Sequence, residues 1–478
     1  MLDKLHAAVL IGEKLGADFV EARFDDFTLR TLRRIKTRSN DTWKDILSKS
    51  RTGIGITCYF DGTPGYSFTA SEEPKDVEET AKRAFRMAKA ASTAASLKLG
   101  FERRPEVKSK PSDTLSVKIH PDTKPQEFKM DLINRMVETA SEHGKEVENI
   151  TGAYGELYGQ KIFTNSEGSN IDWEFLVVDL TCRVTSKTST GDLVFASERK
   201  AGSHGLEAYN QKDSTPEEIG ETAGKFATEQ LQAKACPAGK FPTLIDNALA
   251  GVLAHESFGH LSEADFVTIG VSPLAGKIGT TLGTKHATII DGGIPDIDKT
   301  GGLWLPFDDQ GIPANMTTIL EKGVLKHFLH NRGTAHQLEQ ELTSNCRAIH
   351  FGFMPIPRMT NTFFTSGSLT EEEALEQLGT GVYAIQTAGG QVEGDGSFLF
   401  KANRGYWVEN GQIQHPIREV ALSGNILQLL QRVVGATRDL EIWGTYFGGC
   451  GKGGQHPLPT GLGGPKLLIE DVTFGGKA

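Results

Sequence analysis

The chain has 478 residues, which is more than one compact hydrophobic core accommodates, so two or three domains are expected. Its hydrophobic fraction of 38% and charged fraction of 23% are typical of an ordinary globular protein. The formal net charge of −10 argues against nucleic acid or an anionic membrane as a partner, and no run of about 18 apolar residues predicts a transmembrane helix.

The five cysteines are few, odd in number and scattered along the chain. This pattern favours a reducing cytosol over a disulfide framework. The N-terminal segment 1–17 contains charged residues and has no apolar core of the kind found in signal peptides. We therefore expect a cytoplasmic protein.

The sequence of the first half predicts both helices and strands. Periodic apolar residues over 1–16 predict an amphipathic helix, and alternating residues over 17–38 predict a strand. A hairpin is expected over 53–68 with its turn at Asp61-Gly62, and a helix is expected after Ser71, which suits an N-cap. Further on, the sequence predicts a connection rich in Pro and Lys over 103–126, a helix over 128–143, several strands over 149–198 and a capped helix over 215–234.

The favoured domain boundary is Cys236-Pro237-Ala238-Gly239. Beyond it, short apolar strands are broken by Gly and Pro, as in 288–293 and 318–325. We therefore expect an α+β protein. Its N-terminal domain, residues 1–235, would combine helices with a mixed or antiparallel sheet, and its C-terminal domain, residues 236–478, would be mainly β.

The segment most informative about function is His255-Glu256-Ser257-Phe258-Gly259-His260, which follows an apolar run over 249–254. Imidazole is a common ligand of divalent metals, and a Glu beside such a site is the usual general base of zinc peptidases. The two His are five positions apart, so on a regular helix their side chains diverge by about 140°. They converge only if the helix widens into a π-bulge or breaks near Gly259, and π-bulges gather at functional sites.

A third metal ligand must come from elsewhere, because a catalytic zinc usually has three protein ligands and a water. Cys450 is the best candidate, since it lies in the glycine-rich segment 446–454 and Lys452 nearby would favour its thiolate. Two imidazoles and a thiolate suit zinc. Alternatives stay open, because a His pair can belong to a helix core and a lone Cys can be a small buried hydrophobe. His330 and His350 are further candidate ligands or electrophiles.

Two acidic residues, Glu263 and Asp265, follow the motif. They could orient a metal-bound imidazole, although such residues more often form a helix surface or cap. The segment Phe307-Asp308-Asp309-Gln310-Gly311 has the composition of a turn, and ordinary turn chemistry is its favoured interpretation.

Taken together, these segments resemble the TldD/PmbA family of metallopeptidases. The block Pro357-Arg358-Met359-Thr360-Asn361-Thr362 and the segment 449–455 are specific in combination. The TldD branch of the family keeps the metal motif and the PmbA (TldE) branch lacks it, so the chain looks like the TldD branch. Gln310 departs from the Glu that we expect in many relatives, but it lies outside the metal motif. The resemblance covers most of the chain and is carried by segments 53–56, 255–260, 307–313, 354–362, 389–392 and 449–455.

This resemblance implies zinc held by His255, His260 and Cys450, with Glu256 as the catalytic base. It also implies peptidase activity on unstructured peptides, which lie along a strand edge in a channel between subunits. Family members work as heterodimers of TldD with a PmbA/TldE-like subunit or as related homodimers, and we expect the N-terminal domain to contribute to the channel and to the dimer contacts. No nucleic acid and no membrane is expected as a partner.

The expected function is therefore hydrolysis of peptide bonds by metal-activated water, with Glu256 as general base. One alternative is a non-catalytic metal-binding modulator or partner subunit in a protein complex. A structural zinc normally has four protein ligands and only three are convincing here, which favours catalysis. The other alternative is a metal-free scaffold in which the His pair lies in the core, and metal analysis separates it from both metal-binding functions.

Overall fold

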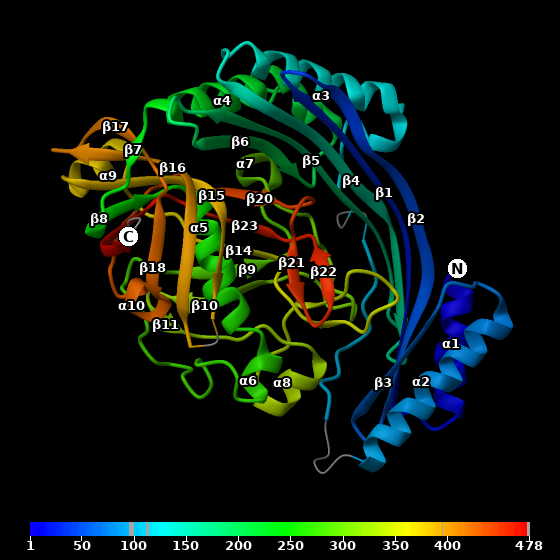
Figure 1. Cartoon of the computed structure of the whole chain (residues 1–478). Helices are drawn as coiled ribbons and strands as arrows, with labels where there is room; N and C mark the ends of the chain where they lie inside the picture. The colour runs from blue at the N-terminus through cyan, green and yellow to red at the C-terminus, as the bar shows by residue number, and fades with distance from the viewer. Residues whose placement is uncertain (95–99, 111–113, 394, 476–478) are drawn as a thin grey trace.

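The computed structural model describes residues 1–94, 100–110, 114–393 and 395–475. Residues 95–99, 111–113, 394 and 476–478 lie outside the described part, so the predicted connection over 103–126 is described only in part. Figure 1 shows a long N-terminal sheet that curves over the C-terminal half, with the N-terminal helices on its outer side. The protein is α+β, which confirms the predicted fold class.

The N-terminal sheet is antiparallel and has six strands in the order β3-β2-β1-β4-β5-β6. Three of its strands are long: β1 and β4 have 19 residues each and β2 has 20. The strands are β1 (Phe19–Thr37), β2 (Asp41–Phe60), β3 (Thr63–Thr69), β4 (Val147–Asn165), β5 (Asn170–Lys187) and β6 (Leu193–Gly202).

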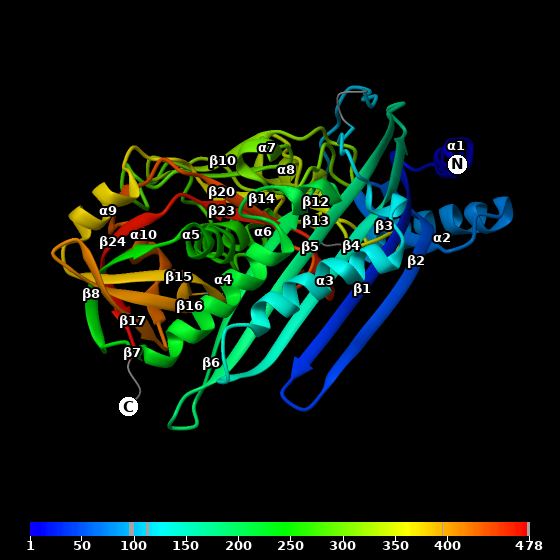
Figure 2. The ribbon, with the colours of Figure 1, turned by 90° about the horizontal axis from the view of Figure 1, so that it is seen from above.

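Four helices cover the outer face of this sheet, as Figure 2 shows from above. The first pair packs on β1 and β2, and the second pair packs over β4, β5 and β6. The last helix begins at the predicted N-cap Thr215, whose side chain forms a capping box with Glu218. It ends earlier than predicted, because residues 234–235 already belong to a strand. The helices are α1 (Leu2–Lys14), α2 (Pro74–Ala94), α3 (Gln126–Ser141) and α4 (Pro216–Glu229).

The C-terminal half contains two larger sheets. One follows the order β15-β8-β24-β18-β16-β17-β7, with β19 paired to β24, and the other follows β11-β10-β9-β14-β23-β20. Their strands are β7 (Lys234–Ala235), β8 (Gly239–Ile245), β9 (Ile289–Gly292), β10 (Met316–Glu321), β11 (Val324–Leu325), β14 (Asn361–Phe364), β15 (Gly381–Val392), β16 (Ser397–Glu409), β17 (Gln412–Arg418), β18 (Ala421–Asn425), β19 (Val433–Ala436), β20 (Glu441–Gly444), β23 (Gly461–Gly464) and β24 (Leu467–Phe474).

Two short hairpins and several short helices complete this half. The hairpins are β12 (Cys346–Arg347) with β13 (Ile356–Pro357), and β21 (Cys450–Lys452) with β22 (Gln455–Leu458). The helices are α5 (Asn247–Leu253), α6 (Ala264–Thr268), α7 (Ile297–Thr300), α8 (Arg332–Leu338), α9 (Glu371–Leu378) and α10 (Ile426–Leu430).

Helix α5 lies in the middle of the C-terminal half, where Figure 1 shows it among strands of both sheets. All seven of its residues are buried, as expected for a helix that is apolar on every side. Asp246 caps its first turn by accepting a hydrogen bond from the Leu249 N–H at 2.9 Å. The core therefore holds this helix rigidly, and the helix carries the His-Glu motif at its C-terminal end.

The division into residues 1–235 and 236–478 remains a prediction. Strand β7 falls just before the predicted boundary and pairs with β17 of the C-terminal half. Among the described residues, no helix is long and apolar enough to cross a membrane.

Candidate metal centre

The His-Glu motif forms a π-helix over Ala254–Gly259, which continues directly from α5. This confirms the predicted widening of the helix. The wider turn brings the His255 and His260 rings together, with their centroids 5.2 Å apart. Close packing favours a glycine at 259, because a Cβ there would lie only 2.0 Å from the Met359 sulfur and the Met359 side chain would have to shift. The glycine of the motif and the Met of the Pro-Arg-Met-Thr-Asn-Thr block thus lie against each other.

Cys450, the first residue of β21, lies beside the two imidazoles. Its Sγ is 3.4 Å from His260 Nε2, and one ligand atom from each of His255, His260 and Cys450 lies within 4.8 Å of the others. A tetrahedral zinc separates its nitrogen and sulfur ligands by about 3.6 Å, so a small adjustment would close the set around the ion. His255 Nδ1 is buried and has no hydrogen-bond partner within the described part of the chain. The donor set fits zinc.

The electrostatics of the cluster favour a thiolate. Burial opposes ionisation of Cys450, but the adjacent His255 and His260 outweigh it and lower the pKa of the thiol to about 4. The expectation that Lys452 would favour the thiolate is not supported, because its Nζ pairs instead with Glu263 at 3.1 Å and Asp265 at 2.7 Å. A thiolate is the form in which Cys binds a metal.

Glu263 supports His260 from behind. Its side chain is fully buried, and its Oε2 lies 3.0 Å from His260 Nδ1. Lys452 and Arg358 surround the same carboxylate, with Arg358 Nε 3.9 Å from Oε1. Burial opposes protonation of His260, but Glu263 and Cys450 raise its pKa well above the usual range. Glu263 is therefore placed to orient the imidazole. It also occupies the N-cap position of α6, as the favoured interpretation allowed, but its side chain makes no capping hydrogen bond.

Glu256 lies on the more open side of the cluster. Its side chain is 31% exposed, and its Oε2 is 3.9 Å from His260 Nε2. Because Glu256 contacts the cluster and also reaches solvent, a water and a substrate carbonyl could approach between the carboxylate and the ligand atoms.

The structure places the two other candidate histidines outside this cluster. His330 is buried and pairs with Gln340 at 2.8 Å, and burial lowers its pKa to about 4. His350 Nδ1 accepts a hydrogen bond from the Gly352 N–H at 3.0 Å. Within the described residues, the group able to hold a metal is His255, His260 and Cys450.

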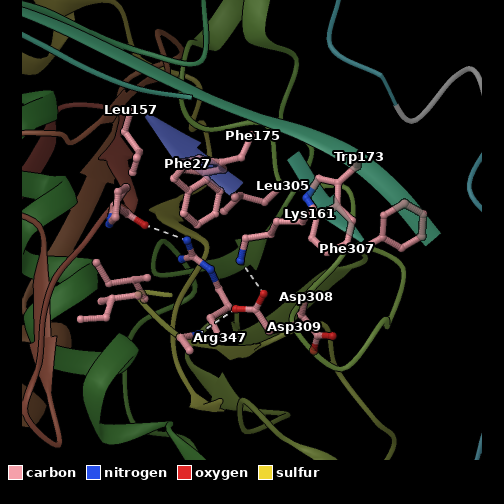
Figure 3. A pocket seen from close by; sticks show the side chains of 14 residues that line it. Phe27, Leu157, Lys161, Trp173, Phe175, Leu305, Phe307, Asp308, Asp309 and Arg347 are labelled. Carbon is pink, nitrogen blue, oxygen red and sulfur yellow. Dashed lines mark hydrogen bonds and ion pairs between the residues drawn. The ribbon is translucent and has the colours of Figure 1, made fainter. Parts of the chain in front are cut away.

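A small cavity lies between the N-terminal sheet and segments of the C-terminal half that include Arg347 and Leu458. Leu458 belongs to β22 and pairs with Cys450. Figure 3 shows Phe27, Trp173 and Phe175 of the sheet on one side of the cavity and Arg347 on the other. The cavity measures about 20 Å³, which leaves room for about one water molecule. Arg347 donates hydrogen bonds to Met359 O at 2.6 Å and Pro459 O at 2.8 Å. Arg347 thereby links Pro459, which follows β22, to Met359, whose side chain packs on Gly259.

The segment 307–311 forms the expected turn and also has a second role. Asp308 accepts the N–H groups of Gln310 and Ile312, each at 2.9 Å, in ordinary turn chemistry. The neighbouring Asp309 forms a buried ion pair with Lys161 of β4 and so joins the turn to the N-terminal sheet. Sequence reasoning missed this link, because Lys161 has no distinguishing local pattern.

Two family models match the chain. One describes the PmbA/TldA metallopeptidase C-terminal domain and matches residues 238–476, and the other describes the PmbA/TldA metallopeptidase central domain and matches residues 119–231. The chain belongs to the PmbA/TldD metallopeptidase family. It is thus a metallopeptidase by family, which confirms the predicted resemblance.

Named relatives agree with this membership. The chain is 33% identical over 434 residues to a metalloprotease of Methanothermobacter thermautotrophicus, covering 91% of each chain. It is 31% identical over 253 residues to a zinc metalloprotease TldD homolog of Saccharolobus solfataricus, covering 53% of this chain and 55% of that one. The crystal structure of TldE from Thermococcus kodakarensis superposes with a TM-score of 0.76 at 18% identity, over 99% of this chain and 100% of that chain, which shows a shared fold.

Proposed function

We propose that this member of the family is a zinc-dependent peptidase that hydrolyses peptide bonds in unstructured peptides. The observation that carries the proposal is the π-helix, which brings His255 and His260 within reach of Cys450 and beside Glu256. A site of three protein ligands leaves a position for water, as in catalytic zinc sites. The name of the Saccharolobus solfataricus relative, a zinc metalloprotease, supports the choice of metal.

In this proposal, His255, His260 and Cys450 hold the metal and Glu256 moves the proton. Bound zinc would supply Lewis acidity toward water and the peptide carbonyl. Glu256 takes a proton from the attacking water and hands it to the leaving amine. Glu263 holds a proton on His260 Nδ1, which would leave the Nε2 lone pair free to bind the metal. An extended peptide bound through main-chain hydrogen bonds to a strand edge would give weak sequence preference.

We further propose that the protein acts in the cytoplasm as a dimer, either with a second copy or with a PmbA/TldE-like subunit. The fold that the chain shares with TldE supports a partner of the same architecture. The five free cysteines, all buried, support a reducing compartment.

Hydrolysis of unstructured peptides tests the proposed function directly. The wild-type protein, alone and mixed with a PmbA-type subunit, should lose activity in a chelator and regain it with zinc. Glu256→Gln should retain zinc and lose activity by about 100-fold or more. Full activity in Glu256→Gln would show that the base is misassigned. Bound zinc without hydrolysis in any mixture would instead support the modulator function.

A further inference from the structure

Thr31, Gly155 and Asp179 lie side by side on the inner face of the N-terminal sheet and form a small contact surface, here called the seat. Thr31 of β1 lies opposite Gly155 of β4, and Gly155 lies opposite Asp179 of β5. Successive side chains of a strand point to opposite faces, and the adjacent row is buried beneath the outer helices. That adjacent row consists of Leu32, Tyr154 and Leu180. The seat therefore faces the C-terminal half of the molecule.

Tyr446, four residues before Cys450, occupies this seat. Its hydroxyl lies 2.9 Å from Thr31 Oγ1. Its ring lies against Gly155 so closely that a Cβ there would be 2.1 Å from a ring carbon. Asp179 Oδ2 accepts hydrogen bonds from the Tyr446 N–H at 3.4 Å and from the Phe447 N–H at 3.2 Å. Strand β4 therefore needs a glycine at position 155, where the Tyr446 ring packs against it.

The chain between Tyr446 and Cys450 has little stiffness of its own. Gly448 and Gly449 both have positive φ values, 99° and 70°, which glycine adopts readily. A glycine pair in an unanchored loop has large conformational entropy, so it would leave the thiolate poorly placed. On the far side, β21 supplies only a short pairing, in which Cys450 lies opposite Leu458. Anchoring on both sides of the glycines is what fixes the position of the sulfur.

We propose that Thr31, Gly155 and Asp179 are positioning residues for Cys450, and that the N-terminal sheet thereby completes the metal site of the C-terminal half. Figure 1 shows β21 and β22 under the curve of this sheet. The inference rests on the proposed function, in which Cys450 is a zinc ligand. Its consequence is that docking of the sheet and metal affinity are coupled, although no residue of the sheet contacts the metal.

Metal affinity and a spectroscopic signature test the proposal without any activity assay. Zinc affinity is measured by competition with a chelator, and cobalt substitution reports thiolate ligation through its near-ultraviolet charge-transfer band. Gly155→Ala and Asp179→Ala should lower zinc affinity about tenfold and weaken the band. Asp179→Asn should restore both, because its amide oxygen can still accept the two N–H groups. Thr31→Val, which removes one hydroxyl, should give a smaller loss and serves if the other variants fold poorly.

A matched control separates the seat from its surroundings. Arg199 forms an ion pair with Asp179 but makes no contact with the Tyr446 backbone in the described hydrogen bonds. Arg199→Gln should therefore leave zinc affinity and the cobalt band unchanged. A loss in Arg199→Gln equal to that in Asp179→Ala would overturn the proposal, since the ion pair rather than the backbone anchor would then matter.

A double-mutant cycle tests whether the seat acts through Cys450. In a Cys450→Ala background, Gly155→Ala should cause no further loss of zinc affinity, because the ligand that it positions is gone. An equal tenfold loss in both backgrounds would overturn the proposal by showing general damage. If Cys450→Ala alone leaves zinc affinity unchanged, the ligand assignment of the proposed function fails and the positioning role falls with it. If Cys450→Ala weakens binding but all three seat variants bind zinc normally, only the positioning role is overturned.

Discussion

Replacing Glu263 with Gln should weaken zinc binding without removing any ligand. The carboxylate accepts the His260 Nδ1–H at 3.0 Å and lies between Lys452 and Arg358, at 3.1 and 3.9 Å. The substitution keeps an acceptor for His260 but removes the charge that makes its Nε2 more basic, and it leaves two cations without their shared anion. Loss of such a partner typically costs about 10–100-fold in metal affinity, which is about 1.4–2.7 kcal/mol.

Competition with a chelator at fixed pH and ionic strength measures this loss. Asp265→Asn is the matched control, because Asp265 pairs with the same Lys452 at 2.7 Å but does not contact His260. Zinc affinity should therefore fall in Glu263→Gln and change little in Asp265→Asn. Equal affinities in wild type and Glu263→Gln would refute the reasoning that this buried carboxylate supports the metal ligand.

Three further substitutions test the packing, the titration and the capping described above. Gly259→Ala would place a Cβ 2.0 Å from the Met359 sulfur, so we expect overpacking by about 1–3 kcal/mol, seen as a lower thermal midpoint and weaker zinc binding; an unchanged midpoint would contradict this. In the unfolded chain His330 is protonated below its ordinary pKa of 6.5, whereas burial in the native protein lowers this pKa to about 4. The free energy of unfolding therefore decreases as the pH falls between these values, by about 2 kcal/mol at pH 5. His330→Gln should flatten that dependence in urea titrations at pH 5 and pH 7, and the same slope in both proteins would refute it. Thr215→Ala removes the capping box of α4 and should cost about 1 kcal/mol, with faster amide exchange in its first turn as the readout; unchanged exchange there would count against the cap.

Local pattern predicted most elements of the N-terminal half and the metal motif, but it missed residues 41–52 of β2 and began α2 just after Ser71 rather than at Pro74. The amphipathic period over 1–16 corresponds to α1, and the Thr215 cap begins α4 as expected. The five-residue spacing of the two His required a distorted helix if they were to converge, and the π-helix supplies it. These predictions succeeded because the relevant interactions lie within one or two turns of the chain.

Partners distant in sequence could not be predicted in the same way. Glu263 and Lys452 meet only because β21 folds back against α6, so composition made Glu263 look like a surface residue and Lys452 like a partner of Cys450. Asp179 lies in an alternating strand, where a polar residue normally indicates a solvated face. In the C-terminal half, β14 pairs in parallel with β23, a glycine-rich segment that carries no strand signal of its own.

The most direct test of the account is the metal content of the untagged protein, measured by mass spectrometry for wild type and for Cys450→Ser. The account predicts about one zinc per chain in the wild type and its loss in the variant. A wild-type protein that holds no metal after zinc is supplied, or a Cys450→Ser variant that keeps the full amount, would contradict the proposed metal centre.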